Sequence, residues 1–270
     1  MTETTRKTQR WAVGVEYDGS PFYGFQRQRQ SPTVQGCLEE ALSRVADEPI
    51  TIHASGRTDT GVHAFGQVVH FESSRHRTTR AWLLGAQTHL HPGVAIRWVQ
   101  PVSDDFHARY SARARCYRYR ILNRLDRTAI DRDRVFWVHQ RLNAEAMQQA
   151  ATALLGEHDF TSFRAAGCNR QHAIRTVRAL QVKRRGDEID IDIEANAFLY
   201  HMVRNIAGSL VLVGRGERPI EWLGDLIEAK SRSQSGMTAP AHGLYFIKAL
   251  YDARWGLPAE YATPLAEALS

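Results

Sequence analysis

The sequence of 270 residues lacks most features of exported or metal-binding proteins. It has only three cysteines, Cys37, Cys116 and Cys168, and no C-x-x-C pair. An odd count without such spacing is typical of a protein in a reducing compartment, so we expect a cytoplasmic protein without a disulfide framework. The 12 histidines form no H-E-x-x-H motif and no zinc-ligand spacing, so we also expect no metal.

Long hydrophobic runs are absent as well. The longest, around Ile206 to Val213, is far shorter than the ~20 residues that cross a bilayer. The N-terminal segment MTETTRKTQR is polar and no apolar stretch follows it, so we expect neither export nor a membrane anchor. No linker rich in Gly, Ser or Pro divides the chain, so we expect a packed junction near residues 104–107.

Negative charge is in modest deficit. The chain has 35 Lys and Arg against 29 Asp and Glu, a net charge of +6, which favours a polyanionic partner. Seven arginines and three tyrosines lie between His107 and Arg127, with Asp126 as the single acid. Such a segment can bind phosphates and stack on bases. It is equally consistent with a solvated, arginine-rich strand and its flanks.

Hydrophobic periodicity predicts an α+β protein with two halves. The first half has the order βαββαβ, with strands over 11–17, 49–54, 66–72 and 94–100 and helices over 34–45 and 79–90. The second repeats this order, with strands over 115–122, 176–184, 188–194 and 244–250 and helices over 143–155, 198–213 and 219–229. We therefore expect two ferredoxin-like or RRM-like units, residues 1–105 and 106–270, in a bilobed protein with a central, mostly antiparallel sheet and a basic cleft.

The segment 54–72, ASGRTDTGVHAFGQVVHFE, places a carboxylate in a glycine-flanked loop between two predicted strands. Asp59 is the only acid in this loop, and the positive charge of Arg57 two residues earlier would keep it ionised. Loops held by rigid strands commonly carry functional groups. The same residues also form a good turn, with Asp59 as an Asx cap and Gly61 at positive φ. The residues alone leave both interpretations open.

The motifs GRTDTGVHA and GQVVHF resemble the signature of TruA-type pseudouridine synthases, in which this aspartate is the catalytic nucleophile. Further segments resemble the same family in the same order along the chain: YDGSPFYGFQRQ at 17–28, TVQGCLEEAL at 33–42, DDFHARYSARARCYRYRI at 104–121, FLYHMVRNIAGSL at 198–210 and APAHGLYF at 239–246. The resemblance covers roughly residues 11–250 and does not depend on one short pattern.

The resemblance implies roles for five residues. Asp59 would be catalytic, and Arg204 would pair with it. Tyr117 and Leu244 would contact opposite faces of the target uracil, and Arg57 would also bind the substrate. The expected tRNA contacts are Phe106, His107, Ala108, Arg109, Tyr110, Arg164, Asn169 and Arg170.

Without the resemblance, three of these residues have ordinary structural explanations. Tyr117 is a half-buried strand tyrosine and Leu244 a core leucine. Arg204 lies in an apolar helix, where an unpaired buried charge is costly, so it could extend to the surface or pair elsewhere.

The resemblance further implies a cofactor-free enzyme, a homodimer, that isomerises uridines 38, 39 and 40 in the anticodon stem-loop of tRNAs. The target base must leave its stack, and Asp59 could then attack ribose C1′, add to the base or remove the 2′ proton. Two rival interpretations stay open. One is a non-catalytic RNA-binding protein with two RRM-like units, which accounts for the basic segment but not for the GRTD loop. The other is a metal-independent hydrolase that uses Asp59.

Overall fold

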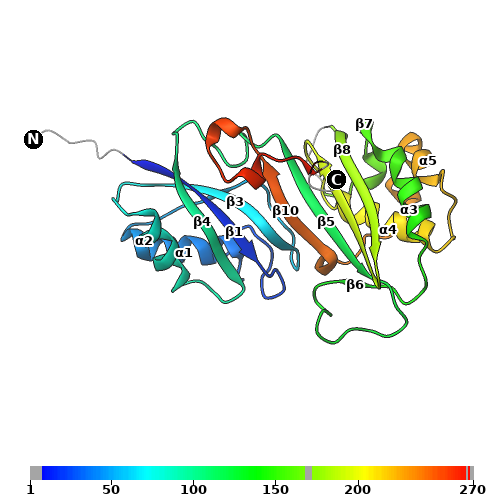
Figure 1. Cartoon of the computed structure of the whole chain (residues 1–270), viewed down its shortest axis with the longest axis horizontal. Helices are drawn as coiled ribbons and strands as arrows, with labels where there is room; N and C mark the ends of the chain where they lie inside the picture. The colour runs from blue at the N-terminus through cyan, green and yellow to red at the C-terminus, as the bar shows by residue number, and fades with distance from the viewer. Residues whose placement is uncertain (1–7, 168–171, 266, 268–270) are drawn as a thin grey trace, which may run out of the picture. The chain divides into compact units, whose positions relative to one another are not determined.

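The computed structural model describes residues 8–167, 172–265 and 267, and the chain divides into two compact units. Unit 1 comprises the described residues up to Arg113 together with Phe246–Pro264. Unit 2 comprises the described residues from Ala114 to Tyr245 together with residues 265 and 267. Each unit combines helices with mostly antiparallel strands, which confirms the α+β class (Figure 1).

Unit 1 has the predicted order βαββαβ. Its elements are β1 (Gln9–Tyr17), α1 (Val34–Ala46), β2 (His53–Ala54), β3 (His63–Ser73), α2 (Thr79–Gln87), β4 (Val94–Val102) and the part of β10 (Leu244–Leu250) from Phe246 onward. The strands lie in the order β4-β1-β3-β10, and β2 pairs with β3.

The strand expected over 49–54 is reduced to the two residues of β2. The N–H groups of Ile50 and Ile52 donate to the side chains of Ser43 (2.8 Å) and Glu39 (3.2 Å) on α1. Because these side chains satisfy the backbone donors, the segment before His53 does not need a strand partner.

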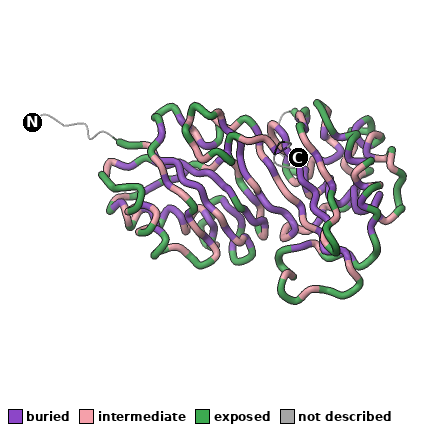
Figure 2. Tube along the Cα trace, viewed as in Figure 1, coloured by how far each residue is buried: buried purple, intermediate pink, exposed green. Residues whose placement is uncertain are grey.

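The core of unit 1 lies between its sheet and the two helices that cover one face of it (Figures 1 and 2). Each helix begins at a threonine cap, since the hydroxyls of Thr33 and Thr78 accept backbone N–H groups of the first turn. The fully buried Trp82 of α2 packs on Trp11 and Phe71, with ring centroids 6.0 and 4.9 Å apart.

Unit 2 contains β5 (Ala114–Leu122), β6 (Phe136–Trp137), α3 (Ala144–Ala151), β7 (Gly156–Asp159), β8 (Ile174–Arg185), β9 (Glu188–Ala195), α4 (Met202–Gly214), α5 (Trp222–Ala229) and the start of β10. Its strands lie in the order β5-β9-β8-β7, with β6 beside β5. Periodicity missed β6 and β7, since both are very short and neither is fully buried. The helix expected from residue 198 begins at Met202, because the positive φ of His201 (58°) interrupts a right-handed helix.

The pairing of β5 with β9 gives unit 2 one apolar and one ionic sheet face. Tyr117 and Tyr119 lie opposite Ile193 and Ile191, whereas Arg118 and Arg120 lie opposite aspartates. This confirms that the two tyrosines share a face and that Arg118 points to the other one.

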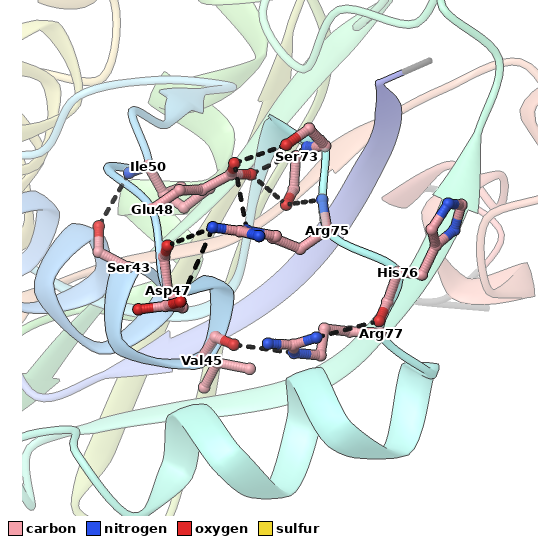
Figure 3. Close-up of polar contacts among 10 residues, drawn as sticks. Ser43, Val45, Asp47, Glu48, Ile50, Ser73, Arg75, His76 and Arg77 are labelled. Atoms are coloured by element: carbon pink, nitrogen blue, oxygen red, sulfur yellow. Dashed lines mark hydrogen bonds and ion pairs between the residues drawn. The ribbon is translucent and has the colours of Figure 1, made fainter. Parts of the chain in front are cut away.

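A cluster of hydrogen bonds joins the turn after α1 to the end of β3 (Figure 3). The carboxylate of Glu48 accepts from the hydroxyls of Ser73 (2.6 Å) and Ser74 (2.7 Å) and from the N–H of Ser74 (2.9 Å). These bonds, with that from the Ser73 hydroxyl the strongest cause, hold the pKa of Glu48 below its ordinary value. Glu48 therefore anchors this turn as an ionised carboxylate.

We expect Glu48→Gln to lower the free energy of unfolding at pH 7 by about 1–2 kcal/mol, because hydrogen bonds to a charged acceptor are lost. Since the folded pKa of Glu48 is depressed, this stabilisation is present above the unfolded carboxyl pKa and is lost as pH falls through the folded pKa. Urea unfolding across this range measures it. Glu40→Gln is the control: its pair with Arg44 (2.8 Å) is exposed, and its loss should cost roughly 0.5 kcal/mol or less. Equal losses in the two variants would contradict the prediction.

Candidate functional site

Asp59 lies in unit 1, in the turn between β2 and β3. The N–H of Val62 donates to the carbonyl of Asp59 (3.1 Å), and Gly61 has φ 77°. This is the turn that the sequence predicts, in which glycine supplies the positive φ. Thr58 is buried, whereas Arg57 is exposed and Asp59 is partly exposed. Thr58 thus anchors the loop while its charged neighbours stay accessible.

Buried polar side chains hold the strand side of this loop. The hydroxyls of Tyr17 and Thr58 share a hydrogen bond of 2.7 Å. The fully buried Gln67 donates from its amide to the carbonyl of Gly56 (2.8 Å) and accepts from the hydroxyl of Ser55 (2.5 Å). Burial raises the pKa of Tyr17 to about 12, so its phenol is neutral at physiological pH.

Tyr17 and Gln67 were not candidates from the sequence. Gln67 did carry a signal, since it is a polar residue in the otherwise apolar run GQVVHF, and a buried amide must find partners. Tyr17 carried none, because its spacing is that of any core residue of β1.

Two glycines of the loop after β1 bring its backbone against the Asp59 turn. A Cβ on Gly19 would lie 2.1 Å from the carbonyl oxygen of Val62. Gly24 has φ 84°, and its Cβ would lie 3.0 Å from the carbonyl oxygen of Thr58. That carbonyl also accepts the N–H of Phe25 (3.0 Å). The turn is therefore held from both sides, by Gln67 and Tyr17 and by the backbone of residues 19–25.

Unit 2 carries three further predicted site residues. Tyr117 on β5 is half-buried and packs edge-on against Phe198, with ring centroids 5.0 Å apart. Arg204 on α4 is half-buried and donates from Nε to the carbonyl of Ala239 (2.7 Å). Leu244 is buried at the start of β10.

The predicted RNA-contacting segment 106–110 lies in unit 1. Phe106 and Ala108 are fully buried, so their side chains support the segment from inside. Arg109 and Tyr110 are exposed, with 76% of Tyr110 accessible. The ring centroids of His107 and Tyr110 are 4.3 Å apart. Nδ1 of His107 accepts the N–H groups of Arg109 (3.1 Å) and Tyr110 (3.3 Å). His107 thus shapes the turn that presents an arginine and a tyrosine to solvent.

The other predicted RNA contacts are in unit 2. Arg164 is half-buried beyond a short 3-10 helix, Thr161–Phe163. Asn169 and Arg170 lie outside the described residues.

Several arginines of the segment 107–127 are neutralised by acids. Arg118 forms a two-point pair with Asp192 (2.7 and 2.9 Å), and Arg120 lies 3.0 Å from Glu188. Further pairs join Arg113 to Asp252 and Arg124 to Asp126. On β5, the charges of Arg118 and Arg120 are therefore locally offset by acids.

Three histidine rings, His53, His70 and His107, contact one another at the segment 106–110, to which His107 itself belongs. The ring of His70 lies 5.1 Å from that of His53 and 4.5 Å from that of His107. Nδ1 of His70 accepts the N–H of Ala108 (3.2 Å). Burial, reinforced by His107, His53 and Arg10, lowers the pKa of His70 to about 3, and burial also lowers the pKa of His107. Both rings are therefore neutral acceptors for the backbone of this segment at pH 7.

Within the described residues, no group of three or more His, Cys, Asp and Glu side chains is arranged to hold a metal ion. Across residues 8–167 and 172–265, no helix has both the length and the apolar character needed to span a membrane.

Known proteins resemble the chain over most of its length. The model of a family described as tRNA pseudouridine synthase matches residues 14–111 and 150–252. The tRNA pseudouridine synthase A of Xanthomonas campestris pv. campestris (strain B100) is 53% identical over 253 residues, 93% of this chain and 98% of that protein. The protein of that name from Stenotrophomonas maltophilia (strain K279a) is 52% identical over 252 residues, with the same coverage. Likeness to the crystal structure of a Cbf5-Nop10-Gar1 complex is weak, with TM-score 0.33, 11% identity and coverage of 90% of this chain and 49% of that chain.

We expect Gly19→Ala to lower the free energy of unfolding by about 1–3 kcal/mol, because the added methyl group would overlap the Val62 carbonyl and displace the Asp59 turn. Urea unfolding measures the change. Gly224→Ala on α5 is the control: the nearest heavy atom would be 3.8 Å away, and alanine should be neutral or stabilising there. A Gly19→Ala protein as stable as wild type would contradict the close backbone contact.

We expect the protein to lose stability as pH falls from about 6.5 toward 3, in part through His70. Its folded pKa is depressed, so its stabilising effect is present above the unfolded pKa and is lost as pH falls toward the folded pKa of about 3. The loss should be on the order of a few kcal/mol. His70→Asn keeps an acceptor for the Ala108 N–H but removes the titration, so its free energy of unfolding should depend less on pH in this range. The exposed His76→Asn should keep the wild-type slope; if His70→Asn also keeps it, the assignment is wrong.

Proposed function

The chain belongs to the tRNA pseudouridine synthase family, and on that premise we propose that it isomerises uridine to pseudouridine at positions 38, 39 and 40 of the tRNA anticodon stem-loop, with Asp59 as the nucleophile. The observation that carries the assignment of Asp59 is the rigid turn beneath it. Its side chain is partly exposed while the backbone on either side is fixed by Gln67 and Gly19. A carboxylate held in this way needs little reorganisation to meet a flipped nucleotide.

The reaction exchanges one bond to ribose C1′ for another. The bond from N1 breaks, the bond from C5 forms, C5 loses a proton and N1 gains one, so no atom or electron is left over. This balance requires no cofactor or metal. Asp59 can serve by attacking C1′, by adding to the base or by removing the 2′ proton, and each route needs the ionised carboxylate.

The remaining site residues complete the proposal. Arg204 pairs with the carboxylate of Asp59, and Tyr117 and Leu244 hold the uracil between them. Arg57, exposed two residues before Asp59, orients the flipped nucleotide. In this proposal the half 1–105 brings the nucleophile, and the half 106–270 brings the groups that bind the base.

The proposed tRNA contacts are the segment 106–110 together with Arg164, Asn169 and Arg170. In the first of these, Tyr110 and Arg109 are accessible, and an exposed tyrosine beside a guanidinium suits base stacking and phosphate binding. Phe106 and Ala108 contribute through the backbone that they position. We further propose that the enzyme acts in the cytoplasm as a homodimer, as the family resemblance implies.

We expect Asp59→Asn to abolish the reaction while tRNA binding is retained. The reaction is followed by release of tritium from unmodified tRNA labelled at uracil C5. The modified positions are mapped by the stops that carbodiimide adducts of pseudouridine cause in reverse transcription. Loss of the nucleophile should reduce the single-turnover rate by at least roughly 10⁴-fold. Asp47→Asn, at an exposed carboxylate after α1, is the matched control and should keep the wild-type rate. Release of label by Asp59→Asn at the wild-type rate would refute the role of Asp59 as nucleophile. If the wild-type protein binds tRNA without releasing label, it is a non-catalytic RNA-binding protein. If it cleaves the substrate, it is a hydrolase.

A further inference from the structure

The segment after α5 in unit 2, residues 231–243, lies against α4 through direct backbone contact. A Cβ on Gly208 would lie 1.9 Å from the carbonyl oxygen of Met237. A Cβ on Gly236 would lie 2.8 Å from the backbone nitrogen of Ser209. A side chain on either glycine would push the segment away from α4. The backbone of residues 236–237 therefore packs directly on the second turn of α4.

Arg232 joins this segment to itself and to α4. Its Nη1 donates to the hydroxyl of Ser235 (2.8 Å) and the carbonyl of Gly236 (2.9 Å). Its Nη2 donates to the hydroxyl of Thr238 (3.0 Å) and to Oδ1 of Asn205 (3.1 Å). The hydroxyl of Thr238 also donates to Asn205 (2.6 Å), which is fully buried. One guanidinium therefore fixes the segment at three residues and on the helix.

The segment reaches Arg204 immediately beyond these bonds. The N–H of Ala239 donates to the carbonyl of Arg204 (3.2 Å), and Nε of Arg204 donates to the carbonyl of Ala239 (2.7 Å). Because the guanidinium is planar, the bond from Nε makes its orientation depend on the position of that carbonyl. The hydroxyl of Tyr119 donates to the next carbonyl, that of Pro240 (2.8 Å).

The contacts of Arg232 require its shape as well as its charge. Among the described residues, it hydrogen-bonds only with neutral oxygens, from hydroxyl, amide and carbonyl groups. Four such bonds use the planar fork of a guanidinium, whereas the ammonium of a lysine is a point charge with three donors. A lysine at this position would keep the positive charge and lose the four hydrogen bonds of the guanidinium. Arg232→Lys therefore separates the effect of the charge from the effect of the hydrogen bonds.

We propose that Arg232 is a positioning residue for pseudouridine formation: it fixes the carbonyl of Ala239 and thereby orients the guanidinium of Arg204. This inference rests on the proposed pairing of Arg204 with Asp59. Arg232 acts on the chemical step and not on the affinity for tRNA, because it is not among the proposed tRNA contacts.

The test is a double-mutant cycle with Arg204. Single-turnover tritium release, the Kd for unmodified tRNA and the Tm are measured for wild type, Arg232→Met, Arg232→Lys, Arg204→Lys and the Arg204→Lys/Arg232→Met double variant. Arg232→Met and Arg232→Lys should each slow label release about 10- to 100-fold, with Kd within about threefold of wild type. In the Arg204→Lys background, Arg232→Met should change the rate by less than about threefold, because the group that it orients is already gone.

Arg184 provides a matched control in the same unit. It too binds neutral oxygens, with Nη2 donating to Oδ1 of Asn123 (2.7 Å) and to the carbonyl of Leu142 (2.8 Å). Arg184→Met should lower the Tm and keep the wild-type rate of release. If Arg232→Met does not fold, Thr238→Val takes its place in the cycle, because it removes the hydroxyl that contacts Arg232 and Asn205 and leaves the Arg232 side chain in place.

A second readout follows the geometry directly. The Nε–H resonance of Arg204, identified by its absence in Arg204→Lys, should shift or broaden in Arg232→Met and stay unchanged in Arg184→Met.

The inference is overturned if Arg232→Met keeps the wild-type rate, if it changes only Kd, or if it slows release by the same factor in both backgrounds. If Arg204→Lys releases label more slowly than wild type and Arg232→Met gives any of these three results, only the role of Arg232 is refuted and the proposed function still holds. An Arg204→Lys enzyme at the wild-type rate removes the proposed role of Arg204, and the positioning role with it.

Discussion

The backbone contact between residues 19–25 and the Asp59 turn is the constraint on which the proposed chemistry depends. Gly19 lies so close to Val62 that no side chain fits between them, and Gln67 holds the carbonyl of Gly56 from the strand side. A short loop with one exposed acid would otherwise sample many conformations, at a cost of about 1–2 kcal/mol per residue when a substrate fixes it. In this protein the conformational entropy of the turn is already lost on folding, so substrate binding does not have to fix it.

Unit 2 holds Arg204 by a similar device. A helix and a following loop meet at glycines, Gly208 and Gly236, and a buried polar side chain, Asn205, joins them. In both units a proposed site residue extends from backbone that is fixed by hydrogen bonds whose partners do not titrate near neutral pH. These bonds therefore keep the same geometry across neutral pH, which is what the proposed reaction of the Asp59 carboxylate requires of its scaffold.

The sequence predicted those parts of the fold that depend on local pattern. Apolar periodicity located most helices and strands to within a few residues, and glycine chemistry identified the Asp59 turn. Periodicity failed where contacts between residues far apart in the sequence determine the structure. The strand β2 is short because the side chain of Glu39 on α1 accepts the N–H of Ile52. Arg232 gave no signal, since an arginine in a polar loop looks solvated until its four acceptors, which come from its own loop and from α4, are known.

The arginines of unit 2 show why net charge alone does not locate a binding surface. Arg118 and Arg120 lie against Asp192 and Glu188 on the sheet, so their charges are locally offset and contribute little to the potential that an RNA phosphate meets. Arg232, in contrast, binds only neutral oxygens among the described residues, and its positive charge is not cancelled by these contacts. A count of arginines along the chain therefore does not separate a guanidinium that fixes backbone, as Arg232 does, from one whose charge is offset by an acid, as that of Arg118 is.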